Sequence, residues 1–178
     1  MAWTTMPTFV AGPLTAAQLN VLVANINESA PAKATTAGAI FVATGTNAIA
    51  QRVPTSATVA TSQTTTSTSM TDLATVGPTV SSLTTGTQAI VLVTASMSNS
   101  SAGNSARADF AVSGATTRAA SSTTALINES GTANEGMRAT ACTYVTLTAG
   151  SNTFTMKYMV SAAGTGTFND RHLLVIPL

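Results

Sequence analysis

The stretch 138–160 constrains the fold most, because it combines strict alternation with a central turn. Its apolar residues at even positions from Phe154 to Val160 fall on one face of an extended segment, and Lys157 and two threonines fall on the other. Between the two halves, residues 149–152 (AGSN) have the composition of a turn, since Gly and Asn tolerate a positive φ. The pattern therefore predicts two long β-strands that form a hairpin.

A turn centred near Gly150 would place Cys142 opposite Tyr158, and Tyr144 opposite Met156, with all four side chains in the core. A slip of one residue would move Cys142 and Tyr144 to the other face. Because an isolated hairpin is marginal in water, these strands need further strands and a second layer.

From residue 70 onward, short β-like segments alternate with turn signals. Segments 90–93 and 173–176 are apolar at every position, so we expect both to be central strands. About eight strands at this spacing are typical of an antiparallel β-sandwich, here predicted to be jelly-roll-like. The predicted strands are 70–76, 79–84, 88–96, 106–113, 116–127, 136–147, 152–161 and 167–176.

Residues 1–14 form a predicted extended arm, since two prolines and the lack of periodicity exclude a helix there. The arm nevertheless carries large apolar residues, including the single tryptophan, Trp3. Two interpretations remain open: the arm folds back over its own domain, or it docks on a neighbouring subunit.

A short helix is predicted to begin after Thr15. Thr15 and Gln18 fit a capping box, and Leu14 and Leu19 stand at the hydrophobic-staple positions around it. Apolar residues then recur at helical spacing up to Ile26, so the helix presents one apolar stripe. About three turns are too few for a stable isolated helix, so the stripe needs a surface. Ordinary packing would satisfy that need, and so would a partner. The predicted partner-binding residues are Trp3, Phe9, Val10, Leu14, Leu19, Leu22, Val23 and Ile26.

The remaining N-terminal sequence predicts a small hairpin, with apolar residues at 39–43, a turn at 44–47 and a second strand at 48–53. Residues 55–69 are a Thr/Ser tract that fits either a linker or an extended edge strand. We therefore predict a docking region at 1–54, a linker at 55–69 and a β-sandwich domain at 70–178.

Charged residues make up only 7% of the chain, against roughly 25% in an average soluble domain. Such a surface indicates coverage by partners, or an extracellular or virion β protein rich in threonine. The net charge is +1 and basic residues are scattered, which argues against nucleic-acid binding. No apolar run reaches the roughly 20 residues of a membrane helix. The N-terminus lacks signal-peptide features, so we expect synthesis in a cytoplasm.

Residues able to perform catalysis are scarce. The single histidine, His172, follows Asp170 by two residues, but no serine lies in a G-x-S-x-G turn. The six acidic residues are far apart, and no metal-ligand spacing occurs. Cys142 has no internal disulfide partner and is expected to be a small buried hydrophobe. We therefore expect no enzymatic activity, no cofactor and no metal.

Three motifs resemble structural proteins of tailed bacteriophages, chiefly those of actinobacteria. The opening, residues 3–20 (WTTMPTFVAGPLTAAQLN), is similar to the W-T-T-P … F-V-A-G-E-x-L-T-A-A-Q-L-N start of minor tail and virion surface proteins. It departs from that pattern at Pro13, where the family has an acidic residue. Residues 147–155 (LTAGSNTFT) and 175–178 (VIPL) are similar to the C-terminal β domain of those proteins, and 43–48 (ATGTNA) to a connector.

The resemblance implies a virion surface protein, often homotrimeric, without catalytic residues. Its partners would be the major capsid protein or neighbouring virion subunits. A capsid decoration protein is the first hypothesis, because the chain lacks the fibrous middle of a long tail fibre. The alternative is a minor tail or fibre-tip protein that binds a host receptor or glycan. A sugar-binding site would need exposed aromatic rings. Most aromatic residues after residue 70 lie at positions of the alternating pattern that are predicted to face the core.

Overall fold

The computed structural model describes residues 4–5, 12–27 and 29–178, which fall into two compact units, Met1–Val53 and Pro54–Leu178. The first unit contains α1 (Ala16–Asn27), α2 (Ala30–Lys33), β1 (Ile40–Gly45) and β2 (Ala48–Arg52). Among the described residues, no helix is long and apolar enough to cross a membrane.

The first unit confirms the predicted helix cap and hairpin. The Gln18 amide donates a hydrogen bond to Thr15 Oγ1 over 3.3 Å, and the Thr15 amide donates to Gln18 Oε1 over 2.9 Å. This reciprocal pair satisfies two amides at the start of α1. Strands β1 and β2 pair antiparallel around a turn at Asn47, whose φ is 54°. Lys33 Nζ donates to the carbonyl of Ile49 over 3.3 Å and so ties α2 to β2.

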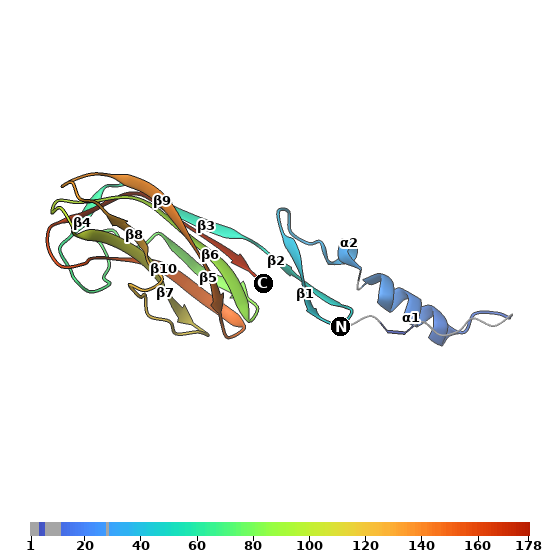
Figure 1. Ribbon diagram of the computed structural model, residues 1–178. Helices are drawn as coiled ribbons and strands as arrows, with labels where there is room; N and C mark the ends of the chain where they lie inside the picture. Colours follow the sequence, from blue (N-terminus) through green and yellow to red (C-terminus); the bar gives the residue numbers. More distant parts are fainter. Residues whose placement is uncertain (1–3, 6–11, 28) are drawn as a thin grey trace. The chain divides into compact units, whose positions relative to one another are not determined.

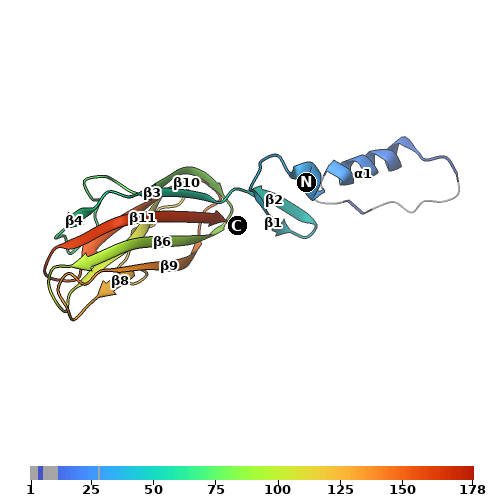
Figure 2. The same cartoon turned by 90° about the horizontal axis from the view of Figure 1, so that it is seen from above.

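The second unit is a sandwich of two antiparallel sheets (Figures 1 and 2). One sheet has the order β5-β10-β7-β8, and the other has the order β3-β11-β6-β9, with the short β4 also paired to β11. The strands are β3 (Thr55–Val59), β4 (Gln63–Thr65), β5 (Thr79–Thr85), β6 (Gln88–Asn99), β7 (Ser105–Gly114), β8 (Leu126–Glu129), β9 (Met137–Thr146), β10 (Gly150–Val160) and β11 (Gly166–Pro177).

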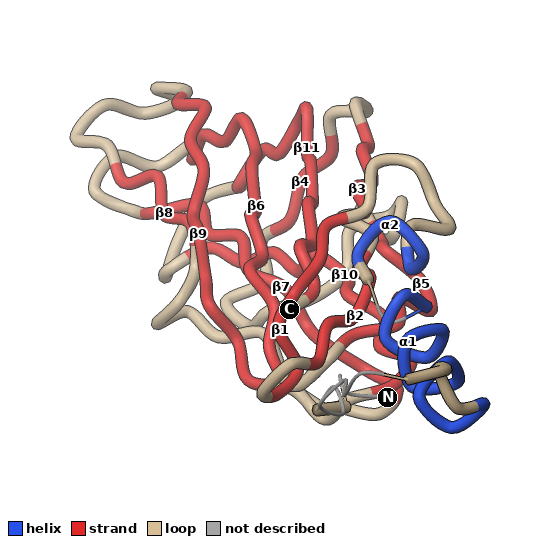
Figure 3. The backbone as a smooth tube through the Cα atoms, turned by 90° about the vertical axis from the view of Figure 1, so that its right-hand side faces the viewer, coloured by secondary structure: helices blue, strands red, loops and turns tan. Residues whose placement is uncertain are grey.

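The strand order is that of a jelly roll. From β5 to β11, every connection except the one from β7 to β8 carries the chain from one sheet to the other. Throughout residues 54–178 the chain consists of strands and loops, and both helices belong to the first unit (Figure 3). The predicted jelly-roll-like β-sandwich is therefore confirmed, as is the central position of β6 and β11 in their sheet.

The predicted hairpin at 138–160 is wrong, although both of its strands exist. β9 pairs with β6, whereas β10 lies between β5 and β7 in the opposite sheet. The connection between them crosses the sandwich instead of turning back. Cys142 and Tyr144 consequently lie on the exposed side of β9, and the side facing the other sheet carries small residues such as Ala139 and Ala141. The alternation identified the strands correctly but could not identify their partners.

The core lies between the two sheets and follows the alternation of their strands. From β10 come Phe154, Met156, Tyr158 and Val160, all fully buried, which confirms the predicted inward face of that strand. The ring of Tyr158 lies 4.9 Å from the ring of Phe168 on β11, between centroids, so aromatic side chains join the two sheets.

Three other predicted segments differ from the structure. Residues 70–76 form only one isolated bridge, between Thr71 and Tyr158, and of 116–127 only the last two residues enter a strand, β8. The linker predicted at 55–69 is wrong, whereas the alternative, an extended edge strand, is confirmed, because β3 and β4 pair with β11 at the edge of the five-stranded sheet. The second unit therefore begins at Pro54 rather than at residue 70.

Gly164 provides a stability prediction in the turn between β10 and β11. Its φ is 85°, and an added Cβ would collide with Asn99 Oδ1 and lie 2.8 Å from Ser101 Cβ. The side-chain Nδ2 of Asn99 also donates to the carbonyl of Ala163 over 3.2 Å. We expect Gly164→Ala to lower the free energy of unfolding by about 2–3 kcal/mol in urea denaturation. The control is Gly131→Ala, which has open space around the new Cβ. Equal effects of the two substitutions would contradict the prediction.

Candidate interaction surface

The apolar stripe of α1 lies exposed on the surface of the first unit. Its five side chains are between 37% and 55% exposed, although the helix is only 12 residues long. An amphipathic helix of this length normally gains its stability by burying such a stripe. The members of the stripe are Leu14, Leu19, Leu22, Val23 and Ile26.

The opposite side of α1 is held by a side chain that the sequence did not single out. Asn25 is only 2% exposed, and its amide pairs with one residue of the arm. The Thr4 amide donates to Asn25 Oδ1 over 2.9 Å, and Asn25 Nδ2 donates to the Thr4 carbonyl over 3.0 Å. A carboxamide offers one acceptor and two donors, so it can pair with both groups of a peptide. The sequence predicted the helix to end around Asn25 and Asn27, and α1 does end at Asn27, but it gave no sign of the contact between Asn25 and Thr4.

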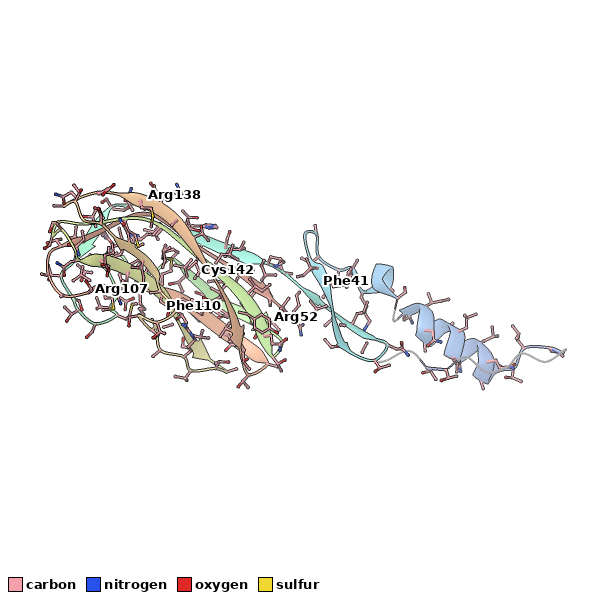
Figure 4. The ribbon with its side chains drawn as sticks, viewed as in Figure 1. Phe41, Arg52, Arg107, Phe110, Arg138 and Cys142 are labelled. Carbon is pink, nitrogen blue, oxygen red and sulfur yellow. The ribbon has the colours of Figure 1, made fainter. Side chains whose placement is uncertain are left out.

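The predicted partner-binding residues therefore divide into two groups. The five on and beside α1 are all exposed. Trp3, Phe9 and Val10 lie outside the described residues. The same unit also exposes Phe41 on β1 (Figure 4), which the sequence assigned to the small hairpin without a role in binding.

In the second unit, a buried arginine fastens loops rather than forming a reactive site. The register of β11 against β6 shifts between Asn169 and His172, and this bulge accompanies a fully buried Arg171. The guanidinium donates to the carbonyls of Thr61 and Gly77 over 3.1 and 3.2 Å. It also donates to the carbonyl of Thr75 and to Gln63 Oε1. These contacts tie two segments on either side of the 66–74 stretch to β11.

Tyr158 completes this buried cluster. Its hydroxyl donates to the carbonyl of Gly77 over 2.8 Å, and the Arg171 guanidinium lies 5.4 Å from the centre of its ring. Burial raises the pKa of Tyr158 well above its ordinary value, and the positive charge of Arg171 opposes that rise only in part. The phenol is therefore a stable hydrogen-bond donor, which suits a structural contact and not proton transfer near neutral pH.

A buried aspartate paired with an arginine fixes the loop between β7 and β8. Asp109 is 1% exposed, and its Oδ2 accepts hydrogen bonds from Arg118 Nη2, the Ser121 amide and Thr124 Oγ1 at 2.7–3.0 Å. Arg118 also donates to the carbonyl of Phe110 and stacks over its ring at 4.1 Å. Every contact of this group is made within the fold.

The residues considered for catalysis and metal binding are not gathered at one place. His172 lies on β11 opposite Thr58 and Thr94, and Asp170 occupies the bulge with a φ of 47°. Within the described ranges, no three His, Cys, Asp or Glu side chains are close enough to hold a metal ion. The expected burial of Cys142 is wrong, because this thiol is exposed.

The fold class defined by these strands is a jelly-roll β-sandwich with an N-terminal helical unit. No protein-family model matches the sequence, and no curated protein matches it. Among solved structures, the Eiger TNF of S. frugiperda covers 70% of this chain and 92% of its own, at 10% identity and a TM-score of 0.46.

The structure of the infectious bursal disease virus Gx strain shows 15% identity over 76% of this chain, with a TM-score of 0.44. The VP2 subviral particle of infectious bursal disease virus shows 12% identity over the same share, with a TM-score of 0.43. This chain spans little more than a third of those two virus chains, 36% and 37%. Because all these TM-scores are below 0.5, the likenesses carry no conclusion about function.

Proposed function

We propose that this protein is a structural component of a virus particle: a capsid decoration protein that binds the shell through its first unit and stabilises it. The observation that carries the proposal is the exposed apolar stripe on α1, a helix whose cap and opposite side are already fastened within the unit. The protein then acts by binding alone and performs no catalysis.

The stripe has the chemistry of a helix that lies in a groove of a partner. Leu19, Leu22, Val23 and Ile26 have the i, i+3, i+4, i+7 spacing by which amphipathic helices anchor in hydrophobic grooves. Fully burying one such side chain contributes roughly 1.5–3 kcal/mol, so a few of them supply the gross energy of a micromolar contact. On a particle with many equivalent sites, repeated weak contacts reinforce each other if copies are linked.

The rest of the chain fits the same role. The sequence resemblance to phage virion surface proteins includes residues 14–20, which contain the helix cap. The β-sandwich carries little charge and has an extensive core, so it suits a rigid body held on the particle surface. The proposed partners are the major capsid protein or neighbouring virion subunits, and the resemblance implies a homotrimer.

The experiment measures binding of the purified chain to particles that lack it, by co-sedimentation. We expect Val23→Glu to weaken binding at least about 100-fold, because a carboxylate would be buried in an apolar contact. The matched control is Asn20→Glu, which introduces the same charge at an exposed polar position of α1 and is expected to change binding less than about 3-fold.

Equal binding of Val23→Glu and the original chain would contradict the role given to the stripe. Imaging of the reconstituted particles then gives the location. Density over the shell supports a decoration protein, whereas density confined to the tail tip would contradict this role and indicate a minor tail protein.

A further inference from the structure

The outer face of the five-stranded sheet carries a patch of apolar side chains that point away from the core of the second unit. In the register of the sheet, Ile176, Ile90 and Tyr144 form one row across β11, β6 and β9. The next row contains Leu174, Leu92 and Cys142. These six residues, called here the outer patch, alternate with buried core residues of the same strands, so they face away from the core.

The two outer faces of the sandwich differ in charge. The four-stranded sheet carries ion pairs on its outer side, where Lys157 Nζ lies 2.6 Å from Asp72 Oδ2 and Asp109 pairs with Arg118. Lys157 and Asp72 are partly exposed to water, whereas Asp109 is buried beneath the loop that Arg118 belongs to. The outer patch contains no acidic or basic side chain, and Tyr144 at its edge strand is 59% exposed.

The remaining charged groups of the five-stranded sheet lie outside the outer patch. His172 belongs to the third row, with Thr94 and Thr140, and Arg138 lies opposite Ser96 in a row farther along β9. Figure 4 marks Cys142 and Arg138 at separate positions on β9. The outer patch is uncharged and has a hydroxyl-rich border. Two copies of it can therefore pack face to face without bringing like charges together.

The size of the face also suits a self-association surface. At about 3.3 Å per residue and about 4.8 Å between strands, the 39 residues of β3, β11, β6 and β9 cover about 600 Å². Stable interfaces bury about 800 Å² of accessible surface per partner, and accessible area exceeds projected area. A second identical sheet is therefore large enough to cover the face, as in other sheet-on-sheet packings.

We propose that a second copy of this chain covers the outer patch, so that the sandwich self-associates through the outer face of β3, β11, β6 and β9. This contact involves the second unit only and needs no particle. It is therefore independent of the α1 stripe, and either proposal can fail without the other.

The first test measures the mass of the full chain in solution by sedimentation, without particles. We expect an assembly of two copies that Leu92→Lys together with Leu174→Lys converts to a monomer. The control is Ser113→Lys, an exposed serine on β7 of the other sheet, which should leave the mass unchanged. A monomeric original chain, or a doubly substituted chain that keeps the assembled mass, would overturn the proposal.

The single thiol provides a second test that needs no substitution, in case the lysine variants fold poorly. Cys142 is the only cysteine and lies within the outer patch. Its rate of maleimide labelling should fall at least about 10-fold as the protein concentration rises from about 1 μM to about 500 μM, since association covers it. A rate independent of concentration, in a chain that sediments as a monomer, would rule out the contact.

Discussion

Replacement of Arg171 by alanine is expected to lower the free energy of unfolding by about 3–5 kcal/mol, a large part of the stability of an ordinary domain. The guanidinium is fully buried and donates to three carbonyls and to Gln63 Oε1. Alanine would remove one donor from each of these four acceptors, would leave the carbonyls of Thr61 and Thr75 without this contact, and would open a cavity beside Tyr158. Both effects act in the same direction.

Two further variants separate these effects. Arg171→Lys keeps the charge and part of the volume, but a lysine cannot reach several carbonyls at once. We therefore expect its free energy of unfolding to lie between those of the original chain and of Arg171→Ala. Arg107→Ala is the control, because Arg107 is half-buried and its Nε donates only to Ser105 Oγ over 2.8 Å. Urea denaturation should give a change of less than about 1 kcal/mol for the control. An Arg171→Ala protein as stable as the control would show that the loop contacts contribute nothing.

Most of the sandwich could be predicted from the sequence, because alternation is a local property of a strand. Segments 79–84, 88–96 and 106–113 correspond to β5, β6 and β7, with ends that differ by a few residues. The apolar segments at 90–93 and 173–176 identified the central strands of their sheet. The number and spacing of the strands then favoured a jelly-roll-like sandwich without any knowledge of pairing.

Pairing itself is a property of the whole fold, and β9 shows why it was missed. The sequence places the larger side chains of this strand, Cys142 and Tyr144, at alternate positions, so they were assigned to the core. In the structure the small Ala139 and Ala141 face the other sheet, and the larger pair belongs to the outer patch. A strand between two apolar surfaces cannot be oriented by hydrophobicity alone.

The segment 70–76, wrongly predicted as a strand, is held by a charged side chain distant in sequence. Residues 70–76 are rich in β-formers, yet Arg171 bonds the carbonyl of Thr75 from a position 96 residues away. Local propensity yields to such contacts because each buried polar group must find a partner. The bulge that accompanies the burial of Arg171 has no signal in the sequence NDRH.

The interaction surface was predicted in part. The cap at Thr15 and the stripe up to Ile26 follow from residue type and spacing, and both are present. Whether the stripe is buried or exposed depends on the packing of the first unit, which spacing does not describe. Asn25 shows the same limit, because its partner is the peptide of Thr4, 21 residues away.

Removal of the Asp109 carboxylate is the second prediction with a large expected effect. Asp109→Ala should cost about 3–4 kcal/mol, because it leaves Arg118 partly buried without its counter-charge and breaks two further hydrogen bonds, from Ser121 and Thr124. The loss should also be local. Loop 115–125 lies against Asp109 through these three contacts, so it should open more often than the strands around it.

Trypsin can detect that opening, since it cleaves after arginine and Arg118 stands inside the loop. We expect cleavage at Arg118 to accelerate at least about 10-fold in Asp109→Ala under native conditions, with a smaller increase at Arg138 on β9. Asp109→Asn keeps one acceptor oxygen, so its rate of cleavage at Arg118 should lie between those of the original chain and of Asp109→Ala. Glu129→Ala, which removes an exposed acid from β8, is the control. Equal acceleration at Arg118 and Arg138 would indicate global unfolding, and the loop would then have no separate dependence on Asp109.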